Sequence, residues 1–161
     1  MIAICNSSPL IALLSIEGIN ILSQLFKKVI IPEAVYREVF ISKIGHEDLN
    51  KAQFLEVKRV KDKKLVKLLR MQLDYGESEV IALALEQEIN RVIIDDKQAR
   101  KIAEELGLKV IGTLGVLILA KEKQIIKEVR PLILTMMEKI NFRISKAVLN
   151  RALEILGEEI I

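Results

Sequence analysis

Short apolar runs alternate along the chain with longer segments in which apolar residues recur every three or four positions. The apolar runs predict buried strands at residues 2–5, 28–31, 91–94 and 109–111, with an edge strand at 54–60. A run that is apolar at successive positions is covered on both faces, which is typical of a parallel sheet between helices. We therefore expect a central parallel sheet of about four or five strands.

The intervening segments predict helices, because their apolar residues share one helical face. The expected helices cover residues 9–14, 19–26, 33–40, 64–72, 76–88, 97–106, 114–123, 126–140 and 145–156. Ser8 is expected to cap the first helix, with Pro9 at its first position, and Thr113 is expected to cap the helix that follows it. Gly107 is typical of a helix end, and Pro131 marks an alternative start for its helix.

Strands that alternate with helices form βαβ units, so the expected fold class is α/β, a three-layer α/β/α domain. Residues 1–161 are expected to form one domain, because no repeat, low-complexity tract or linker interrupts the pattern. Residues 42–53 are expected to be a polar connection with about one helical turn. The C-terminal helices, about 126–156, carry an apolar stripe that packs on the domain, lies at a homodimer seam or binds a small partner protein.

Composition narrows the class of protein. Hydrophobic residues make up 51% of the 161 residues and charged residues 29%, which indicates neither a disordered nor a membrane-spanning chain. A single cysteine excludes an intrachain disulfide, and no charged leader precedes the first apolar run; both favour a cytoplasmic protein. The net charge of +3 is too small to establish a nucleic-acid partner, so the distribution of charge matters more.

Polar residues follow the expected strands where each strand ends. Asn6 follows the strand 2–5, the pair Asp95 and Asp96 follows the strand 91–94, and Thr113 comes shortly after the strand 109–111. Because the carboxyl ends of parallel strands share one edge of a sheet, and ligands of α/β proteins bind at that edge, we expect a crevice there.

Glu77 is expected at the same edge by a length argument. The helix 76–88 spans about 20 Å at about 1.5 Å per residue. The strand after it runs back about 15–17 Å at about 3.3 Å per residue, which returns the helix start to the vicinity of Asp96. Glu77 lies on the apolar stripe of its helix, as does Glu38, and a carboxylate in such a position is partly desolvated and needs a partner.

Each polar residue also has a purely structural interpretation. The segment that ends at Glu77 resembles a capping box, in which the carboxylate would bind the local backbone. Either Asp95 or Asp96 could be the N-cap of the next helix. Taken alone, Glu38 is most simply a solvated residue at the edge of its helix face. Taken alone, Asn6 is most simply a turn residue.

Acids from separate segments that meet at one crevice repel each other unless a cation or a proton intervenes. Oxygen ligands from Asp, Glu and Asn suit Mg²⁺ or Mn²⁺, which is the expected cofactor. The lone His46 and the lone Cys5 cannot form a zinc site; Cys5 is expected in the core and His46 in a polar loop. Asp96 is the expected metal ligand, with Asp95 as a helix cap or a substitute charge.

Six stretches in order along the chain resemble the PIN-domain superfamily, in its branch of VapC-like ribonuclease toxins. They are NSSPLIAL at 6–13, IPEAVYREV at 31–39, GESEVIALA at 76–84, IDD at 94–96, IGTLGVL at 111–117 and NFRIS at 141–145. The resemblance implies an acidic pocket that binds Mg²⁺ or Mn²⁺ and hydrolyses RNA, leaving a 5′-phosphate and a 3′-hydroxyl. It also implies a small antitoxin partner and a homodimer.

Carried over by position, Glu38, Glu77 and Asp96 match the later acidic positions of the family, and Asn6 stands where most members have the first aspartate. The four residues are therefore the implied catalytic and metal-binding set. Because an amide oxygen carries no charge, Asn6 weakens the expectation of tight metal binding and hydrolysis, and Asp95 could partly compensate.

The expected substrate contacts are Ser7, Asp95, Lys97, Arg100 and Thr113. Ser7 matches the small hydroxyl residue that follows the family's first acidic position, and Lys97 and Arg100 lie near the crevice, where cations can bind phosphate. The basic run 58–70 either tracks a phosphate backbone or is a solvated helix face. Aromatic residues make up 4% of the chain, which does not favour base stacking as the main binding mode.

Three functions follow from these features. The first is a metal-dependent endoribonuclease held in check by a small partner protein. The second is a PIN-fold RNA-binding protein that has lost cleavage through Asn6. The third is an unrelated α/β receiver or phosphatase domain with acids at its strand ends, which the ordered stretches disfavour.

Overall fold

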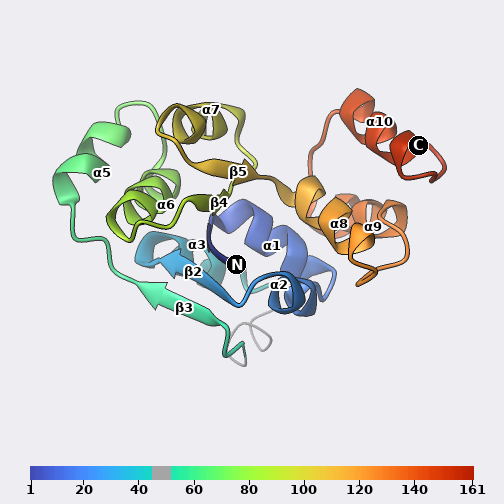
Figure 1. Cartoon of the computed structure of the whole chain (residues 1–161), viewed down its shortest axis with the longest axis horizontal. Helices are drawn as coiled ribbons and strands as arrows, with labels where there is room; N and C mark the ends of the chain where they lie inside the picture. Colours follow the sequence, from blue (N-terminus) through green and yellow to red (C-terminus); the bar gives the residue numbers. More distant parts are fainter. Residues whose placement is uncertain (45–51) are drawn as a thin grey trace.

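The computed structural model describes residues 1–44 and 52–161. Five parallel strands form one sheet in the order β3-β2-β1-β4-β5. They are β1 (Ile2–Cys5), β2 (Lys28–Pro32), β3 (Leu55–Lys58), β4 (Arg91–Ile93) and β5 (Lys109–Ile111). Figure 1 labels β2, β3, β4 and β5. Ile4 of β1 pairs with Ile30 on one side and with Val92 on the other, so β1 is the central strand. The predicted parallel α/β sheet is confirmed.

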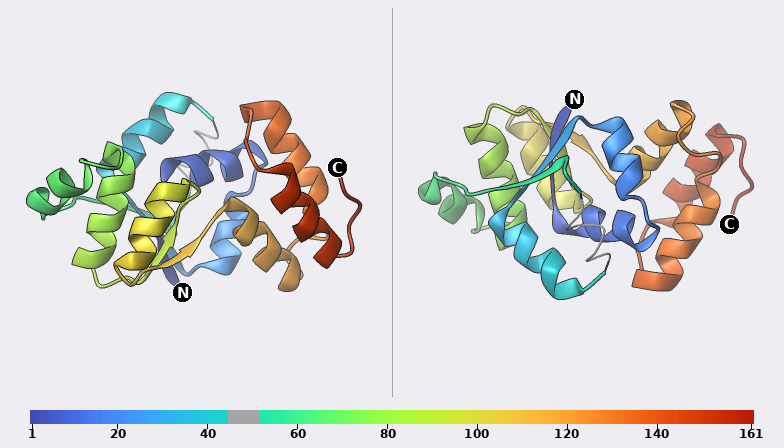
Figure 2. Two further views of the ribbon diagram at one scale, coloured as in Figure 1. Left: turned by 90° about the horizontal axis from the view of Figure 1, so that it is seen from above. Right: turned by 90° about the horizontal axis from the view of Figure 1, so that it is seen from below.

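Helices cover both faces of the sheet in three layers (Figure 2). They are α1 (Ser7–Ser15), α2 (Ile19–Leu25), α3 (Glu33–Ser42), α5 (Lys63–Leu69), α6 (Tyr75–Glu86), α7 (Lys97–Glu105), α8 (Thr113–Glu122), α9 (Arg130–Ile140) and α10 (Lys146–Ile155). Helix α6 packs on β1, β2 and β4, while α3 packs on β2 and β3 and α7 on β5. Helix α6 therefore lies over the centre of the sheet.

The central strands are buried on both faces. Ala3, Ile4 and Cys5 of β1 and Val92 and Ile93 of β4 have no exposed surface. Side chains of successive strand residues point to opposite faces, so burial of every position requires cover on both sides. The unbroken apolar runs in the sequence have this physical cause.

Two predicted helix starts are wrong. Helix α1 begins at Ser7, with Asn6 at the N-cap, so Ser8 does not cap it and Pro9 is its third residue. A proline fits there because the first N–H groups of a helix need no intrahelical acceptor. Helix α8 begins at Thr113 itself, with Gly112 at the N-cap.

Two other predictions about helix ends are confirmed. Gly107 follows the end of α7 with φ +85°, the left-handed conformation that glycine adopts without steric cost. Helix α9 begins at Arg130 with Pro131 as its second residue, so Pro131 does mark the true start of this helix. The predicted connection 42–53 and its helical turn fall largely on residues 45–51, outside the described residues.

The C-terminal helices contact the rest of the chain through buried apolar residues. Helix α9 packs on α1, and Leu149 and Leu153 of α10 are buried. Glu158, just after α10, accepts hydrogen bonds from the backbone N–H groups of Val129 and Arg130 at the start of α9. Helices α9 and α10 are therefore joined to each other by polar contacts as well as by the core.

Over residues 1–44 and 52–161, no single helix is both long and apolar enough to cross a membrane. Only α1 and α2 taken together reach that length and composition, and the two helices are bent by 116° relative to each other.

Candidate active site

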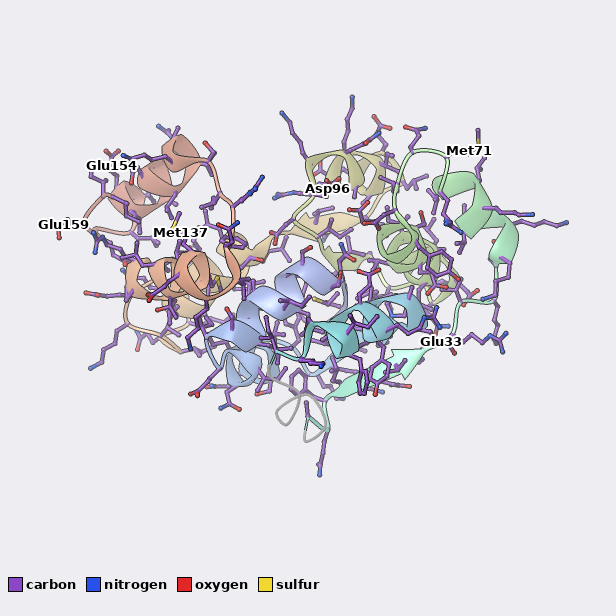
Figure 3. The ribbon with its side chains drawn as sticks, turned by 180° about the vertical axis from the view of Figure 1, so that it is seen from behind. Glu33, Met71, Asp96, Met137, Glu154 and Glu159 are labelled. Carbon is purple, nitrogen blue, oxygen red and sulfur yellow. The ribbon has the colours of Figure 1, made fainter. Side chains whose placement is uncertain are left out.

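The ends of β1 and β4 bring Asn6 close to the pair Asp95 and Asp96. The backbone N–H of Asn6 donates a 3.0 Å hydrogen bond to the carbonyl oxygen of Ile93, the last residue of β4. Asp96 lies at the start of α7, as Figure 3 shows. Parallel pairing of neighbouring strands therefore places both segments at the carboxyl edge of the sheet, as predicted.

Glu38 is held at this edge from two sides. The hydroxyl of Ser7, itself buried, donates a 2.5 Å hydrogen bond to Oε2 of Glu38. On the other side, the backbone of Gly76 is so close that a Cβ there would lie 2.5 Å from Oε1 of Glu38. Glu38 is therefore fixed between α1 and α6, and the interpretation of it as a freely solvated helix edge is wrong.

Glu77 combines a capping role with an acidic neighbourhood. Its N–H donates to Oδ1 of Asp74 at 2.8 Å, and its Oε2 accepts from the N–H of Asp74 at 3.2 Å, so the predicted capping box is confirmed. Burial raises the pKa of Glu77 to about 7, helped by the charge of Asp74 and then by those of Asp96 and Glu38. The length argument that brought Glu77 near Asp96 is therefore confirmed.

The two adjacent aspartates have different partners. Oδ2 of Asp96 accepts a 2.9 Å hydrogen bond from the N–H of Ala99, so Asp96 is the N-cap of α7 and the assignment of that cap to Asp95 is wrong. Asp95 turns to the next strand end, where its two oxygens accept from the N–H and the hydroxyl of Thr113, at 2.7 and 2.5 Å. Helix α7 begins at Lys97, directly after Asp96, while Thr113 occupies both oxygens of Asp95.

The four residues at the edge share one property: each keeps an oxygen that accepts no hydrogen bond from a described residue. Glu38, Glu77 and Asp96 each use one carboxylate oxygen in a structural contact and leave the other uncommitted. Oδ1 of Asn6 is completely buried and also has no hydrogen-bond partner. A buried acceptor without a donor costs free energy, and a cation or a donor from a ligand would remove that cost.

The oxygen donors fit Mg²⁺ or Mn²⁺ in chemical type. Over residues 1–44 and 52–161, however, no group of three or more His, Cys, Asp or Glu side chains is arranged closely enough to hold a metal ion. The predicted ligand set is thus gathered at one edge and linked electrostatically. Its carboxylates do not already converge on one point.

Cys5 is separate from this set. It is completely buried in β1, and burial, followed by the charge of Asp95, raises the pKa of its thiol. The thiol donates to the carbonyl oxygen of Asn6 at 3.3 Å, so it stays protonated and is a core residue, as predicted. His46 lies outside the described residues.

The predicted substrate contacts fall into two groups. Lys97 and Arg100 lie on the first turn of α7, exposed and half-buried respectively. Ser7 and Thr113 are buried and engaged with Glu38 and Asp95, so in this structure they position carboxylates. Direct contact of Ser7, Asp95 or Thr113 with a substrate stays a prediction.

Gly76 and Glu79 were not identified from the sequence as parts of the site. Glu79 is 2% exposed, and its Oε1 accepts a 2.9 Å hydrogen bond from the N–H of Ala34 at the start of α3, the helix that carries Glu38. An acid inside an otherwise apolar helix was the available signal, because a buried carboxylate requires a donor. Gly76 offered no such signal, since its role depends on the approach of α3.

The fold and the site define a three-layer α/β/α domain with acids at the carboxyl edge of a parallel sheet. A family model described as a PIN domain matches residues 2–158, and the chain belongs to the PIN-domain family. PIN domains are typically nucleases, so the family supports nuclease activity in general. A comparison with curated proteins finds no match.

Proposed function

We propose that this protein is a metal-dependent endoribonuclease that hydrolyses RNA phosphodiester bonds. The observation that carries the proposal is the set of uncommitted oxygens on Asn6, Glu38, Glu77 and Asp96 at one edge of the sheet. In open α/β sheets, ligands bind at this carboxyl edge. The expected products carry a 5′-phosphate and a 3′-hydroxyl.

The four residues would hold Mg²⁺ or Mn²⁺. When bound, such an ion lowers the pKa of a coordinated water and offsets charge on the scissile phosphate. The chain's own contribution is positioning, because each carboxylate is held by a second contact: Ser7 holds Glu38, the capping box holds Glu77, and the N–H of Ala99 holds Asp96.

Glu77 couples this site to pH. Because its pKa is about 7, the carboxyl is partly protonated at neutral pH when no cation is near. Glu77 must release that proton before it can act as an anionic ligand, so metal affinity and activity should rise with pH through neutrality.

An RNA-cleavage assay tests the proposal. Labelled RNA is incubated with the protein in Mg²⁺, in Mn²⁺ and in EDTA, alongside Glu38→Gln. We expect cleavage that requires the metal and falls at least about 100-fold in the variant, since a lost ligand misplaces the reacting groups. Cleavage of equal rate in EDTA, or in Glu38→Gln, would contradict the proposal.

A second candidate function rests on Asn6. An amide oxygen brings no charge to the cation, so the site has three carboxylates, and RNA binding without cleavage would be the result if three are too few. RNA that is bound but never cut by the natural protein, and cut by Asn6→Asp, would establish this binding function and replace the first proposal.

We infer a toxin role within a toxin–antitoxin pair from the resemblance to VapC-like proteins. In that role the protein would act in the cytoplasm, as a homodimer, with a small antitoxin as its partner. Expression of the protein should arrest growth, and Glu38→Gln should not. A short reading frame immediately upstream of the gene would add support, whereas equal growth with both forms would contradict the role.

A further inference from the structure

A hollow with a volume of about 600 Å³ opens beside Asp95, at the same edge of the sheet as the candidate active site. We call it the basic groove and define it by six lining residues: Lys97, Arg100, Ile111, Leu114, Phe142 and Arg143. Its volume is within the range of roughly 300–1,000 Å³ that is usual for ligand sites. Figure 1 shows α7 and α10 on either side of the connection from β5 to α8, which supplies residues of the groove lining.

The charge of the basic groove is one-sided. Lys97 and Arg100 come from α7, and Arg143 from the segment between α9 and α10. Within residues 1–44 and 52–161, none of the three cations forms an ion pair or a side-chain hydrogen bond. Asp95 is the single acid among the described residues of the lining, and both of its oxygens accept hydrogen bonds from Thr113. The three cations are therefore available to an anionic ligand.

The floor of the groove is apolar. Ile111, Leu114 and Phe142 are each half-buried in its lining. Gly112 lets the side chains of Asp95 and Arg100 approach its backbone, because a Cβ there would lie 2.8 Å from Oδ1 of Asp95 and 3.0 Å from Nη1 of Arg100. The guanidinium of Arg100 therefore lies close to the backbone of Gly112.

We propose that the basic groove binds the single-stranded segment of RNA next to the bond that is cut. This inference rests on the proposed function. It adds that the bound RNA is single-stranded and that residues of the NFRIS segment, 141–145, contact it. Lys97, Arg100 and Arg143 contact the phosphates, and unstacked bases lie on the apolar floor with Phe142. In a duplex the base faces are stacked on one another and cannot contact the apolar floor. The groove therefore selects single strands.

Continuity with the active site supports this occupant. Asp95, in the groove lining, is the residue before Asp96, so an RNA strand that leaves the carboxylate edge enters the groove directly. A protein segment would also cover the apolar floor, but it would meet three unpaired cations and one acid that is already engaged. Phosphates complement that charge, and neutralising each phosphate adds a salt-dependent contribution to affinity.

Binding in EDTA tests the inference without cleavage. A labelled single-stranded RNA of mixed sequence is titrated with the natural protein and with Lys97→Ala, Arg100→Ala and Arg143→Ala, by fluorescence anisotropy at several salt concentrations. Each variant should weaken binding about fivefold and reduce the slope of log K against log salt by about 1. Arg151→Ala, which removes an exposed cation of α10 outside the groove, is the matched control and should bind like the natural protein.

The outcomes separate the groove from the proposed function. If the natural protein cuts RNA but all three groove variants bind RNA normally, the groove inference is overturned and the nuclease stands, and a protein segment becomes the next occupant to test. If the groove variants lose affinity while no protein cuts RNA, the groove stands and the nuclease fails. Equal affinity for single-stranded and duplex RNA of the same length would also overturn the inference.

Discussion

The backbone of Gly76 packs directly against the carboxylate of Glu38, leaving no room for a Cβ, which would lie 2.5 Å from Oε1. This contact joins the start of α6, where Glu77 follows, to the middle of α3. The position of Glu38 thus depends on a residue that bears no side chain.

Gly76→Ala should displace Glu38 and reduce the rate of RNA cleavage about 100-fold, because a shift of about 1 Å in a reacting group has that effect. Stability should change little, since alanine favours a helix by about 1 kcal/mol and so offsets part of the steric cost. Gly107→Ala is the control: its φ of +85° costs alanine about 1–2 kcal/mol, with no atom of the site nearby. Full cleavage by Gly76→Ala would show that Glu38 needs no such support.

Ser7→Ala tests the other contact of Glu38. A hydrogen bond to a charged group contributes about 1.5–3 kcal/mol, so loss of positioning should lower the cleavage rate about tenfold or more. Ser15→Ala is matched to it, because Ser15 is also a buried serine of α1 and donates to a backbone carbonyl, that of Ala12, at 2.6 Å. Ser15→Ala should lose about 1 kcal/mol of stability and Ser7→Ala about 1.5–3 kcal/mol, but only Ser7→Ala should lose activity. Equal activities would contradict the positioning role.

Glu77 should make the metal-free protein less stable as pH rises. Its pKa in the folded protein, about 7, is above the ordinary value of 4.5, so the folded state binds more protons between these values. The free energy of unfolding should therefore fall from pH 5 to pH 8, by on the order of 1–2 kcal/mol after allowance for solvent screening.

Urea unfolding across this pH range measures the effect. Glu77→Gln can keep the capping box while removing the charge, so its stability should be nearly independent of pH there and higher than that of the natural protein at pH 8. Added Mn²⁺ should restore stability to the natural protein at pH 8 and not to the variant. A steeper fall of the free energy of unfolding with pH in Glu77→Gln would refute the attribution of this pH dependence to Glu77.

Glu158 should hold the C-terminal helices together. Its side chain is 5% exposed; it pairs with Lys121 at 2.7 Å and accepts from the backbone of Val129 and Arg130. Although burial opposes it, these contacts lower the pKa of Glu158, so their stabilising effect is present above about pH 4.5 and is lost on further acidification.

Glu158→Ala should reduce the free energy of unfolding by about 2–3 kcal/mol at pH 7 and by much less at pH 3.5. Glu154→Ala, at the exposed position that Figure 3 labels on α10, should have almost no effect. The same loss at both pH values would mean that packing, and not charge, accounts for the contribution of Glu158.

The sheet and its helices were predictable because burial on both faces leaves a local mark, the unbroken apolar run, as in Ile2–Cys5. The proximity of Glu77 to Asp96 followed from the rise per residue of one helix and one strand. Both inferences use short stretches of chain whose geometry hardly varies.

The remaining features depend on contacts distant in sequence. Ser7 and Glu38 are 31 residues apart, and no local pattern couples a hydroxyl to that acid. Which aspartate caps α7 was undetermined, because Thr113, 18 residues beyond Asp95, turns the Asp95 carboxylate toward the next strand. Arg143 reaches the basic groove only through the packing of α9 and α10.

The dependence of cleavage rate on Mn²⁺ concentration tests the central claim most directly. The natural protein should show saturable activation by Mn²⁺ and no activity in EDTA. Asn6→Asp should reach half-maximal activity at about tenfold lower Mn²⁺, a change well within the roughly 4 kcal/mol that one added charge can contribute near a cation. Cleavage that is independent of Mn²⁺, or an identical activation curve for Asn6→Asp, would contradict a metal site at the carboxyl edge of this sheet.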